Sequence, residues 1–210
     1  MLKRQRKFSV GSRNINLLRV SKKQLIGLKI IFKSMKIAIV SDTHDNLANL
    51  DKLLSFVKKE KITAIFHCGD FTMPETLVHL VSKFDGELFL SLGNADLKEE
   101  ILEIFSKREG LTIFEDIGSV QLENKKIIFS HFLENIKNEL KNYDFAFFGH
   151  THKPSLKIFG KTMVLNPGNL AGLYYKATFA ILDLKTESPQ LKIVDIHQKF
   201  SKSLIAVDKI

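Results

Sequence analysis

The stretch KIAIVSDTHDNLANLDKLLSFVKKEKITAIFHCGD, residues 36–70, decides the fold class of this chain. It opens with an apolar run (36–40), continues with leucines and a valine at helical spacing (47–60), and closes with a second apolar run (63–68). Asn46 stands where a helix N-cap is expected. A strand, a helix and a strand in this order predict two parallel strands joined by a crossover helix.

The same alternation continues and then gives way to strands. We expect a helix from Pro74 to Phe84, a strand at 87–92 and a helix at 97–109. One more helix is expected around 134–142. Short strands are expected at 111–114, 118–123, 126–130, 144–148, 162–165, 177–184 and 191–196, with hairpin turns at ENKK (123–126) and FGK (159–161). A parallel start with a strand-rich end predicts an α/β fold of two packed mixed β-sheets flanked by helices, a four-layer αββα sandwich.

The basic charge of the chain belongs to its first 34 residues. The formal net charge is +9, and residues 1–34 hold 10 Lys and Arg without Asp or Glu, so the remainder has 22 basic and 23 acidic side chains. We interpret 1–34 as a basic N-terminal extension or as a consequence of a start codon upstream of the true one at Met35; a targeting segment and a partner-binding arm are alternatives. Its apolar stretch 24–32 is too short to span a bilayer. Nucleic-acid binding would depend on this extension alone and is the least favoured function.

The remaining chain reads as one domain. We expect it to run over 35–196, followed by a frayed tail at 197–210. Cys68 is the one cysteine, so no intrachain disulfide and no thiolate metal cluster can form, which suits a reducing cytoplasm. Homodimerisation is possible, and nothing in the sequence locates an interface.

Residues able to bind a metal stand at five successive strand exits. The exits read SDTHDN (41–46), HCGD (67–70), GNAD (93–96), SH (130–131) and GHTH (149–152). They supply Asp42, His44, Asp70, Asn94, His131, His150 and His152. Ligands of parallel α/β sheets bind beyond the carboxyl ends of the strands, so these side chains are expected to converge.

The local spacing supports this interpretation. Side chains alternate in an extended chain, so His150 and His152 are expected to project from one side of a strand end. Asp42 and His44 have the same spacing, and glycines directly before ligands allow the backbone to come close to an ion. Carboxylate, imidazole and amide ligands suit Mn, Fe, Zn or Ni, and two such ions about 3.5–4 Å apart form the clamp used in phosphoester hydrolysis. Any one of these residues alone would more often be a turn or capping residue.

Taken in order, these motifs resemble the calcineurin-like metallophosphoesterase superfamily, and the chain size resembles its small prokaryotic phosphodiesterase branch. The motifs lie within 41–169 and as a set are highly specific. The resemblance implies that Asp42, His44 and His152 hold one divalent ion and that Asn94, His131 and His150 hold the other. It also implies that Asp70 bridges both ions, that manganese is the expected metal with Fe, Ni or Zn as alternatives, and that a metal-bridging hydroxide attacks the phosphorus of a small phosphodiester.

Two positions depart from the family pattern. Many of these phosphatases have a histidine after the Asn ligand that protonates the leaving group; here Ala95 stands there, which favours the small phosphodiesterase branch and leaves that proton unassigned. Phe132 occupies a position that is usually glycine, where it would line or distort the pocket. Asp96 is expected either to orient a group of the metal site or to be an exposed helix N-cap. The family's NPG element, 166–168, is read as a rigid turn near the site.

The sequence therefore predicts a metal-dependent phosphodiesterase. The alternative is a catalytically silent scaffold on the same fold, like the related retromer subunit. The complete ligand set argues for the enzyme. His67, His79 and His197 fall outside the matched positions and receive no role.

Overall fold

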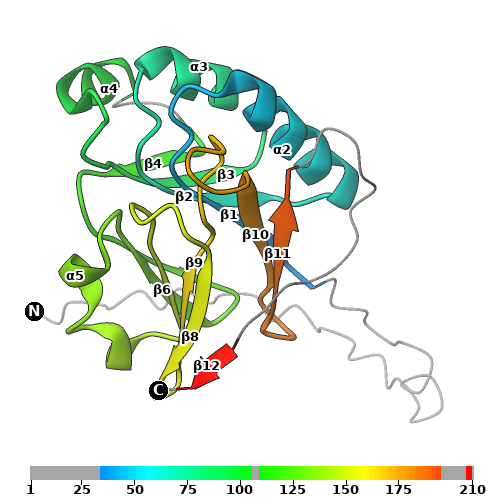
Figure 1. Ribbon diagram of the computed structural model, residues 1–210, viewed down its shortest axis with the longest axis vertical. Coiled ribbons are helices and arrows are strands. Elements are labelled where there is room, and N and C mark those ends of the chain that lie inside the picture. Colours follow the sequence, from blue (N-terminus) through cyan, green and yellow to red (C-terminus); the bar gives the residue numbers. More distant parts are fainter. Residues whose placement is uncertain (1–33, 106–108, 195–206, 210) are drawn as a thin grey trace, which may run out of the picture. The chain divides into compact units, whose positions relative to one another are not determined.

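The computed structural model describes residues 34–105, 109–194 and 207–209, which form one compact unit. The expectations for residues 1–33 and for the tail up to residue 206 lie outside the described residues. Two six-stranded sheets form the centre of this unit (Figure 1).

The first sheet contains the parallel strands expected from the opening stretch. Its order is β11-β10-β1-β2-β3-β4. The strands are β1 (Lys36–Val40), β2 (Ala64–Cys68), β3 (Glu87–Ser91), β4 (Leu111–Phe114), β10 (Thr178–Asp183) and β11 (Ser188–Ile193). β1 to β4 are parallel, whereas β10 is antiparallel to β1 and to β11, so the sheet is mixed. Its crossovers contain α2 (Leu47–Glu60), α3 (Pro74–Lys83) and α4 (Lys98–Phe105).

The second sheet is also mixed and has the order β12-β8-β9-β7-β6-β5. Its strands are β5 (Gly118–Leu122), β6 (Lys125–Phe129), β7 (Phe145–Phe147), β8 (Ser155–Phe159), β9 (Thr162–Asn166) and β12 (Val207–Lys209). The outer face of this sheet carries the short helix α5 (Leu133–Ile136) and the 3₁₀ turn η1 (Leu140–Asn142).

Alternation along the strands divides the core into three layers of side chains. Ile37 and Ile39 of β1 pack between the two sheets, together with Phe66 of β2 and Phe147 of β7. Ala38 and Val40 point the other way, toward the helices α2 to α4. A third cluster lies between the second sheet and α5 with η1. The predicted αββα sandwich is confirmed.

Three elements differ from the sequence prediction. The helix expected at 134–142 is divided, because the bonds Glu139 N–H to Ile136 O and Asn142 N–H to Glu139 O span three residues and tighten the chain into a 3₁₀ turn. Strand β8 was not predicted, although its sequence SLKIF (155–159) alternates polar and apolar residues and the turn expected at 159–161 joins it to β9. β12 pairs with β8 in a region where no strand was expected; it satisfies backbone groups at that edge.

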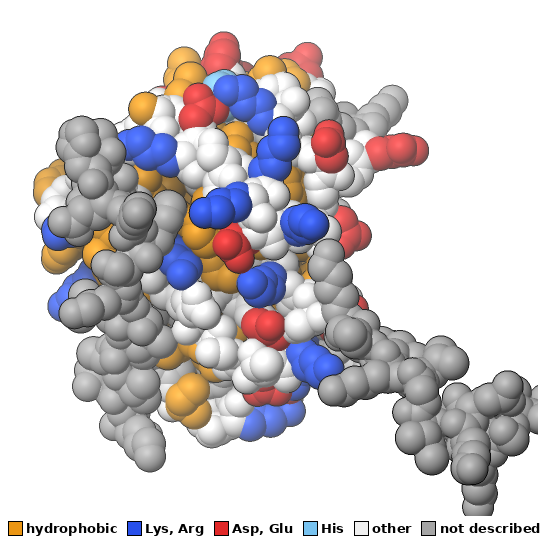
Figure 2. All heavy atoms as spheres, turned by 90° about the vertical axis from the view of Figure 1, so that its right-hand side faces the viewer, with side chains coloured by type: hydrophobic (Ala, Val, Ile, Leu, Met, Phe, Trp, Pro, Cys, Tyr) orange, Lys and Arg blue, Asp and Glu red, His pale blue; other side chains and the backbone are white. Residues whose placement is uncertain are grey.

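The surface of the unit carries charges of both signs. Lys, Asp and Glu side chains share the face shown in Figure 2, with hydrophobic side chains between them. Within the described residues, no helix has the length and apolar character needed to cross a membrane.

Candidate metal centre

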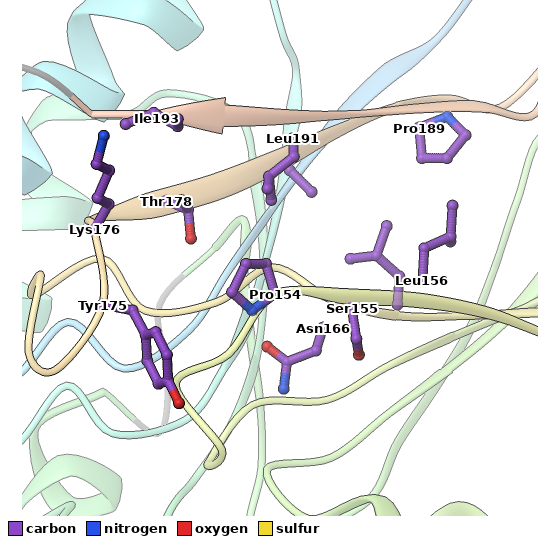
Figure 3. Close-up of a pocket in the computed structure, with 12 residues that line it drawn as sticks. Pro154, Ser155, Leu156, Asn166, Tyr175, Lys176, Thr178, Pro189, Leu191 and Ile193 are labelled. Carbon is purple, nitrogen blue, oxygen red and sulfur yellow. The ribbon is translucent and has the colours of Figure 1, made fainter. Parts of the chain in front are cut away.

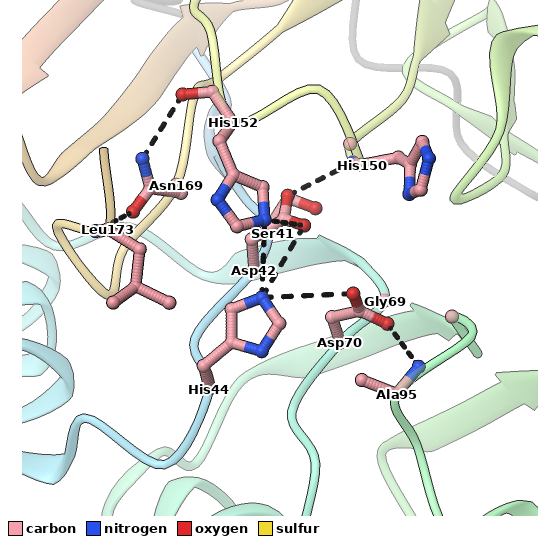
Figure 4. A network of polar contacts seen from close by, with 12 residues as sticks. Ser41, Asp42, His44, Gly69, Asp70, Ala95, His150, His152, Asn169 and Leu173 are labelled. Carbon is pink, nitrogen blue, oxygen red and sulfur yellow. Dashed lines mark hydrogen bonds and ion pairs between the residues drawn. The ribbon is translucent and has the colours of Figure 1, made fainter. Parts of the chain in front are cut away.

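The candidate ligands lie in the loops that follow β1, β2, β3, β6 and β7, at one end of the sandwich. The loops after β1 and β2 remain hydrogen-bonded beyond the strands, with Asp42 N–H donating to Gly69 O (3.0 Å) and His44 N–H to Asp70 O (3.1 Å). The loop after β7 is tied to the first loop, because His150 N–H donates to Oδ2 of Asp42 (3.2 Å). Loops from both sheets therefore meet in one cluster (Figure 4).

Asp42, His44 and His152 form one group of donor atoms. Nε2 of His152 lies 3.2 Å from Oδ1 of Asp42 and 3.3 Å from Nε2 of His44. The three residues can place one ligand atom each within 4.8 Å of the others. Two donors that each bind an ion at about 2.1 Å, with an angle of about 100° between the bonds, stand about 3.2 Å apart. The separations fit a shared cation.

A second group surrounds Nε2 of His131. This atom is 3.1 Å from Oδ1 of Asn94, 3.2 Å from Nδ1 of His150 and 3.3 Å from Oδ2 of Asp70. The same Asp70 oxygen is 3.8 Å from Nε2 of His44. The Asp70 carboxylate thus stands between the two groups, and the seven predicted side chains are brought together.

Five of these residues have left-handed backbone conformations. The φ angles are 54° for Asp42, 40° for His44, 60° for Asp70, 65° for His150 and 57° for His152. The prediction that His150 and His152 alternate in an extended chain is therefore wrong: β7 ends at Phe147, and both histidines turn toward the cluster through strained backbone. Such strain is uncommon for residues other than glycine and concentrates at functional sites.

Glycines next to the ligands permit close packing of the loops. A Cβ atom added to Gly93 would lie 2.1 Å from Oδ1 of Asp70, and one added to Gly149 would lie 1.9 Å from Oγ of Ser41. Neither position has room for a larger residue, so the loops after β3 and β7 approach the buried ligands only because these residues are glycine.

The electrostatics of the cluster favour a cation. Burial raises the pKa of Asp42 to about 6, against the hydrogen bond of Ser41. Its Oδ1 atom has no hydrogen-bond partner among the described residues, which is costly for a buried carboxylate. Burial alone would lower the pKa of His131, but the hydrogen bond and charge of Asp70 outweigh it and the pKa is raised. A divalent ion would reverse both shifts and satisfy the orphaned oxygen, so the residues present fit a metal.

Asp96 is a buried carboxylate that holds two loops of the donor cluster together. It is 8% exposed, so it is not the exposed N-cap that the sequence left open. Oδ2 accepts the backbone N–H groups of Asp70 (2.9 Å) and Gly93 (2.7 Å), and Oδ1 accepts those of Phe71 (2.6 Å) and Thr72 (2.9 Å). Burial raises its pKa, against the hydrogen bonds from Gly93, Thr72 and Asp70. One carboxylate therefore joins the loops after β2 and β3 that carry Asp70 and Asn94.

His67 joins the loops after β1 and β2, a role that sequence reasoning missed. Gly69 N–H donates to its Nδ1 (3.2 Å), so the proton lies on Nε2, which donates to Oγ1 of Thr43 (2.8 Å). Thr43 stands between two candidate ligands. Burial lowers the pKa of His67 to about 3, against the attraction of Asp70, so the ring is neutral.

The NPG element and the residue after it hold the loop of His150 and His152. Asn166 donates from Nδ2 to Gly149 O (2.8 Å), which agrees with a rigid turn beside the site. Asn169 donates to His152 O (3.1 Å) and accepts Leu173 N–H (2.8 Å), a link drawn in Figure 4. Asn169 carried no sequence signal beyond its place after NPG.

The histidines without a predicted role differ in place. His79 pairs with Asp51 (2.8 Å) on α2, outside the cluster. His197 lies outside the described residues.

Phe132 contacts the rings of His131 and His150, with centroid separations of 4.8 and 4.5 Å.

Fold and site together define a class: αββα proteins whose strand ends gather carboxylate, imidazole and amide donors suited to divalent metals. Residues 35–187 match the calcineurin-like phosphoesterase superfamily domain. Phosphodiesterase MJ0936 of Methanocaldococcus jannaschii is 32% identical over 164 residues, which cover 71% of this chain and 93% of that protein. The chain belongs to the calcineurin-like phosphoesterase superfamily, as its motifs predicted.

Solved structures agree on the fold. The structure of a novel archaeal phosphodiesterase superposes with a TM-score of 0.67 and 28% identity, covering 76% of this chain and 99% of that one. Vps29 of Entamoeba histolytica, in complex with Zn²⁺, gives a TM-score of 0.56 at 20% identity, covering 80% of this chain and 97% of that one. The similarity to Vps29 concerns the fold alone.

Proposed function

We propose that this protein is a metal-dependent phosphodiesterase that hydrolyses small phosphodiesters. The observation that carries the proposal is the position of the Asp70 carboxylate, 3.3 Å from His131 and 3.8 Å from His44, between two groups of donor atoms. Asp42, His44 and His152 would hold one divalent ion, and Asn94, His131 and His150 the other, with Asp70 shared. The similarity to phosphodiesterase MJ0936 supports the reaction class.

The residues of the chain prepare the site in three ways. The buried Asp42 and Asp70 supply negative charge to hold cations, and the left-handed loops aim the imidazoles inward. Two divalent ions bound there would supply an activated water and would neutralise charge on the phosphoryl oxygens. Ala95 offers no proton to the leaving group; its backbone N–H instead donates to Oδ1 of Asp70 (2.8 Å) and holds that carboxylate in place. Substrates whose leaving groups need no protonation should react best.

A non-catalytic interaction protein is the second candidate. The fold, which Vps29 shares, is compatible with both candidates, and in this one the same donor cluster would hold a structural metal. The two candidates differ in turnover, not in metal binding.

The deciding experiment measures metal content by mass spectrometry and hydrolysis of bis-p-nitrophenyl phosphate with Mn²⁺ present. We expect bound manganese and turnover in the native protein, and a loss of more than about 100-fold in kcat/KM for Asp70→Asn, because the shared carboxylate would be replaced by a neutral amide. Asp51→Asn is the matched control, since Asp51 lies on the exposed face of α2 and pairs with His79 and Lys83. If the folded native protein binds metal but does not hydrolyse the ester, the result would favour the interaction protein.

A further inference from the structure

Two aromatic side chains flank the candidate metal centre, one beside each group of donors. The ring of Phe132 lies 4.5 Å from that of His150 and 4.8 Å from that of His131. The ring of Tyr174 lies 5.9 Å from that of His152. Neither aromatic residue is among the seven candidate metal ligands, so the proposed hydrolysis assigns no role to either.

Tyr174 is held beside the site although its side chain is in solvent. It is 92% exposed, and its φ of 61° is a left-handed conformation that costs energy for a tyrosine. The base of its loop is fixed to the cluster: Ala171 N–H donates to Asp42 O (3.0 Å), and Asn169 bonds both Leu173 N–H and His152 O. The same asparagine therefore positions a candidate ligand and the loop that presents the ring (Figure 4).

Phe132 lines the site without distorting it. Its ring meets His131 edge-on at 80° and His150 at 56°, and the facing nitrogens of these two histidines remain 3.2 Å apart. The sequence left open whether this side chain lines or distorts the pocket, and the contacts answer that it lines it.

We propose that Tyr174, with Phe132 in support, selects phosphodiesters in which the group that stays on phosphorus carries a planar aromatic ring, either a nucleobase or an aryl ring. Stacking of a base on an aromatic side chain changes affinity by roughly 5- to 150-fold and tolerates different rings. A water molecule adds across one P–O bond, giving a phosphomonoester and an alcohol or phenol. That the selected esters are hydrolysed rests on the proposed function. The stacking itself can be tested by binding alone.

The kinetic test uses esters that share the p-nitrophenolate leaving group and differ in the group that stays on phosphorus: thymidine, phenyl or ethyl. With Mn²⁺, we expect KM for the thymidine or the phenyl ester, or for both, to be at least about fivefold below that of the ethyl ester. Tyr174→Leu should remove this advantage and leave KM of the ethyl ester within about twofold. The thymidine and phenyl arms distinguish nucleobase from aryl recognition.

Tyr175→Leu is the matched control in the same loop. Tyr175 lines a different cavity of about 350 Å³, together with Pro154, Leu156 and Leu191, as Figure 3 shows. This variant should keep the native preference. Equal KM values for all three esters in the native protein, or a preference that survives Tyr174→Leu, would overturn the inference and leave the proposed function standing.

A binding measurement separates the two proposals. Calorimetry with the Mn²⁺-containing protein should give a lower Kd for thymidine 5′-monophosphate or phenyl phosphate than for ethyl phosphate, and Tyr174→Leu should abolish the difference. If this holds while no ester is hydrolysed, the proposed function fails and aromatic recognition stands. Equal Kd values for the three monophosphates would overturn aromatic recognition even if every ester is hydrolysed.

Discussion

The candidate metal centre has a buried inner part, which we call the floor, and a solvent-exposed outer part, which we call the rim. The two parts are built differently. The floor consists of Asp42, Asp70 and His131, all buried. The rim includes His150 and Asn94, both exposed. Asp42 and Asp70 stand on loops that continue the hydrogen bonding of the first sheet. His131 comes from the second sheet and is hydrogen-bonded to the first through its Nδ1 and Cys68 O (2.8 Å).

This difference shows which part of the site exists before any ligand binds. The floor is preorganised by Asp96 and His67, whose side chains are satisfied by backbone or hydroxyl groups and not by candidate ligand atoms. The rim is open to solvent, where metal and substrate would enter. Changes below the floor should therefore alter metal affinity and stability, whereas changes in the aromatic residues at the rim, Phe132 and Tyr174, should alter substrate choice.

Among residues that are not candidate ligands, the largest effect is expected for Asp96→Asn. An amide has one acceptor oxygen and cannot accept the four N–H groups that now meet the carboxylate, so the loops carrying Asp70 and Asn94 should loosen. We expect Mn²⁺ affinity, measured by calorimetry, to fall about 10- to 100-fold. Asp183→Asn is the control, because Asp183 also accepts backbone N–H groups, those of Lys185 and Thr186, but at the other end of the first sheet. Native affinity in Asp96→Asn would show that the floor does not depend on this carboxylate.

The next effect concerns the pH dependence of stability. The pKa of His67 is about 3 in the folded protein and about 6.5 when unfolded, so the unfolded state takes up the proton first as the pH falls. The stabilisation is thus complete above about pH 6.5 and is lost below it, by about 2 kcal/mol between pH 7 and pH 5. Urea unfolding in EDTA should show this loss in the native protein and a shallower one in His67→Gln. Parallel curves for these two proteins would contradict the assignment to His67.

The sequence predicted the first sheet well because its signals are local. The apolar run 36–40 and the helical spacing of 47–60 reappear as β1 and α2 with the same bounds. Strand β8 was missed although Leu156 and Ile158 alternate with Ser155 and Lys157, a pattern that indicates a half-buried strand. The motif order brought out the candidate ligands because parallel strands end at one edge of a sheet.

What the sequence could not reveal are contacts between distant loops. Left-handed backbone at Asp42 and His150 has no local signature, since glycine is the residue that such φ angles usually indicate. His67 lies in a strand and bonds Thr43, 24 residues away, so only the fold discloses their pairing. Asp96 was ambiguous for the same reason: its partners Asp70 to Thr72 are more than 20 residues distant.

The smallest effect is expected at the rim, for Phe132→Gly. The ring packs against His131 and His150 without setting their separation, so Mn²⁺ affinity should stay within about twofold of the native value. Loss of one apolar wall should raise KM for thymidine 5′-p-nitrophenyl phosphate by about two- to threefold, less than Tyr174→Leu does, because the Phe132 ring is partly covered by the histidines it contacts. Steady-state kinetics with paired calorimetry measure both quantities. A tenfold drop in Mn²⁺ affinity would instead place Phe132 among the residues that hold the floor, and the division between floor and rim would have to be redrawn at His131.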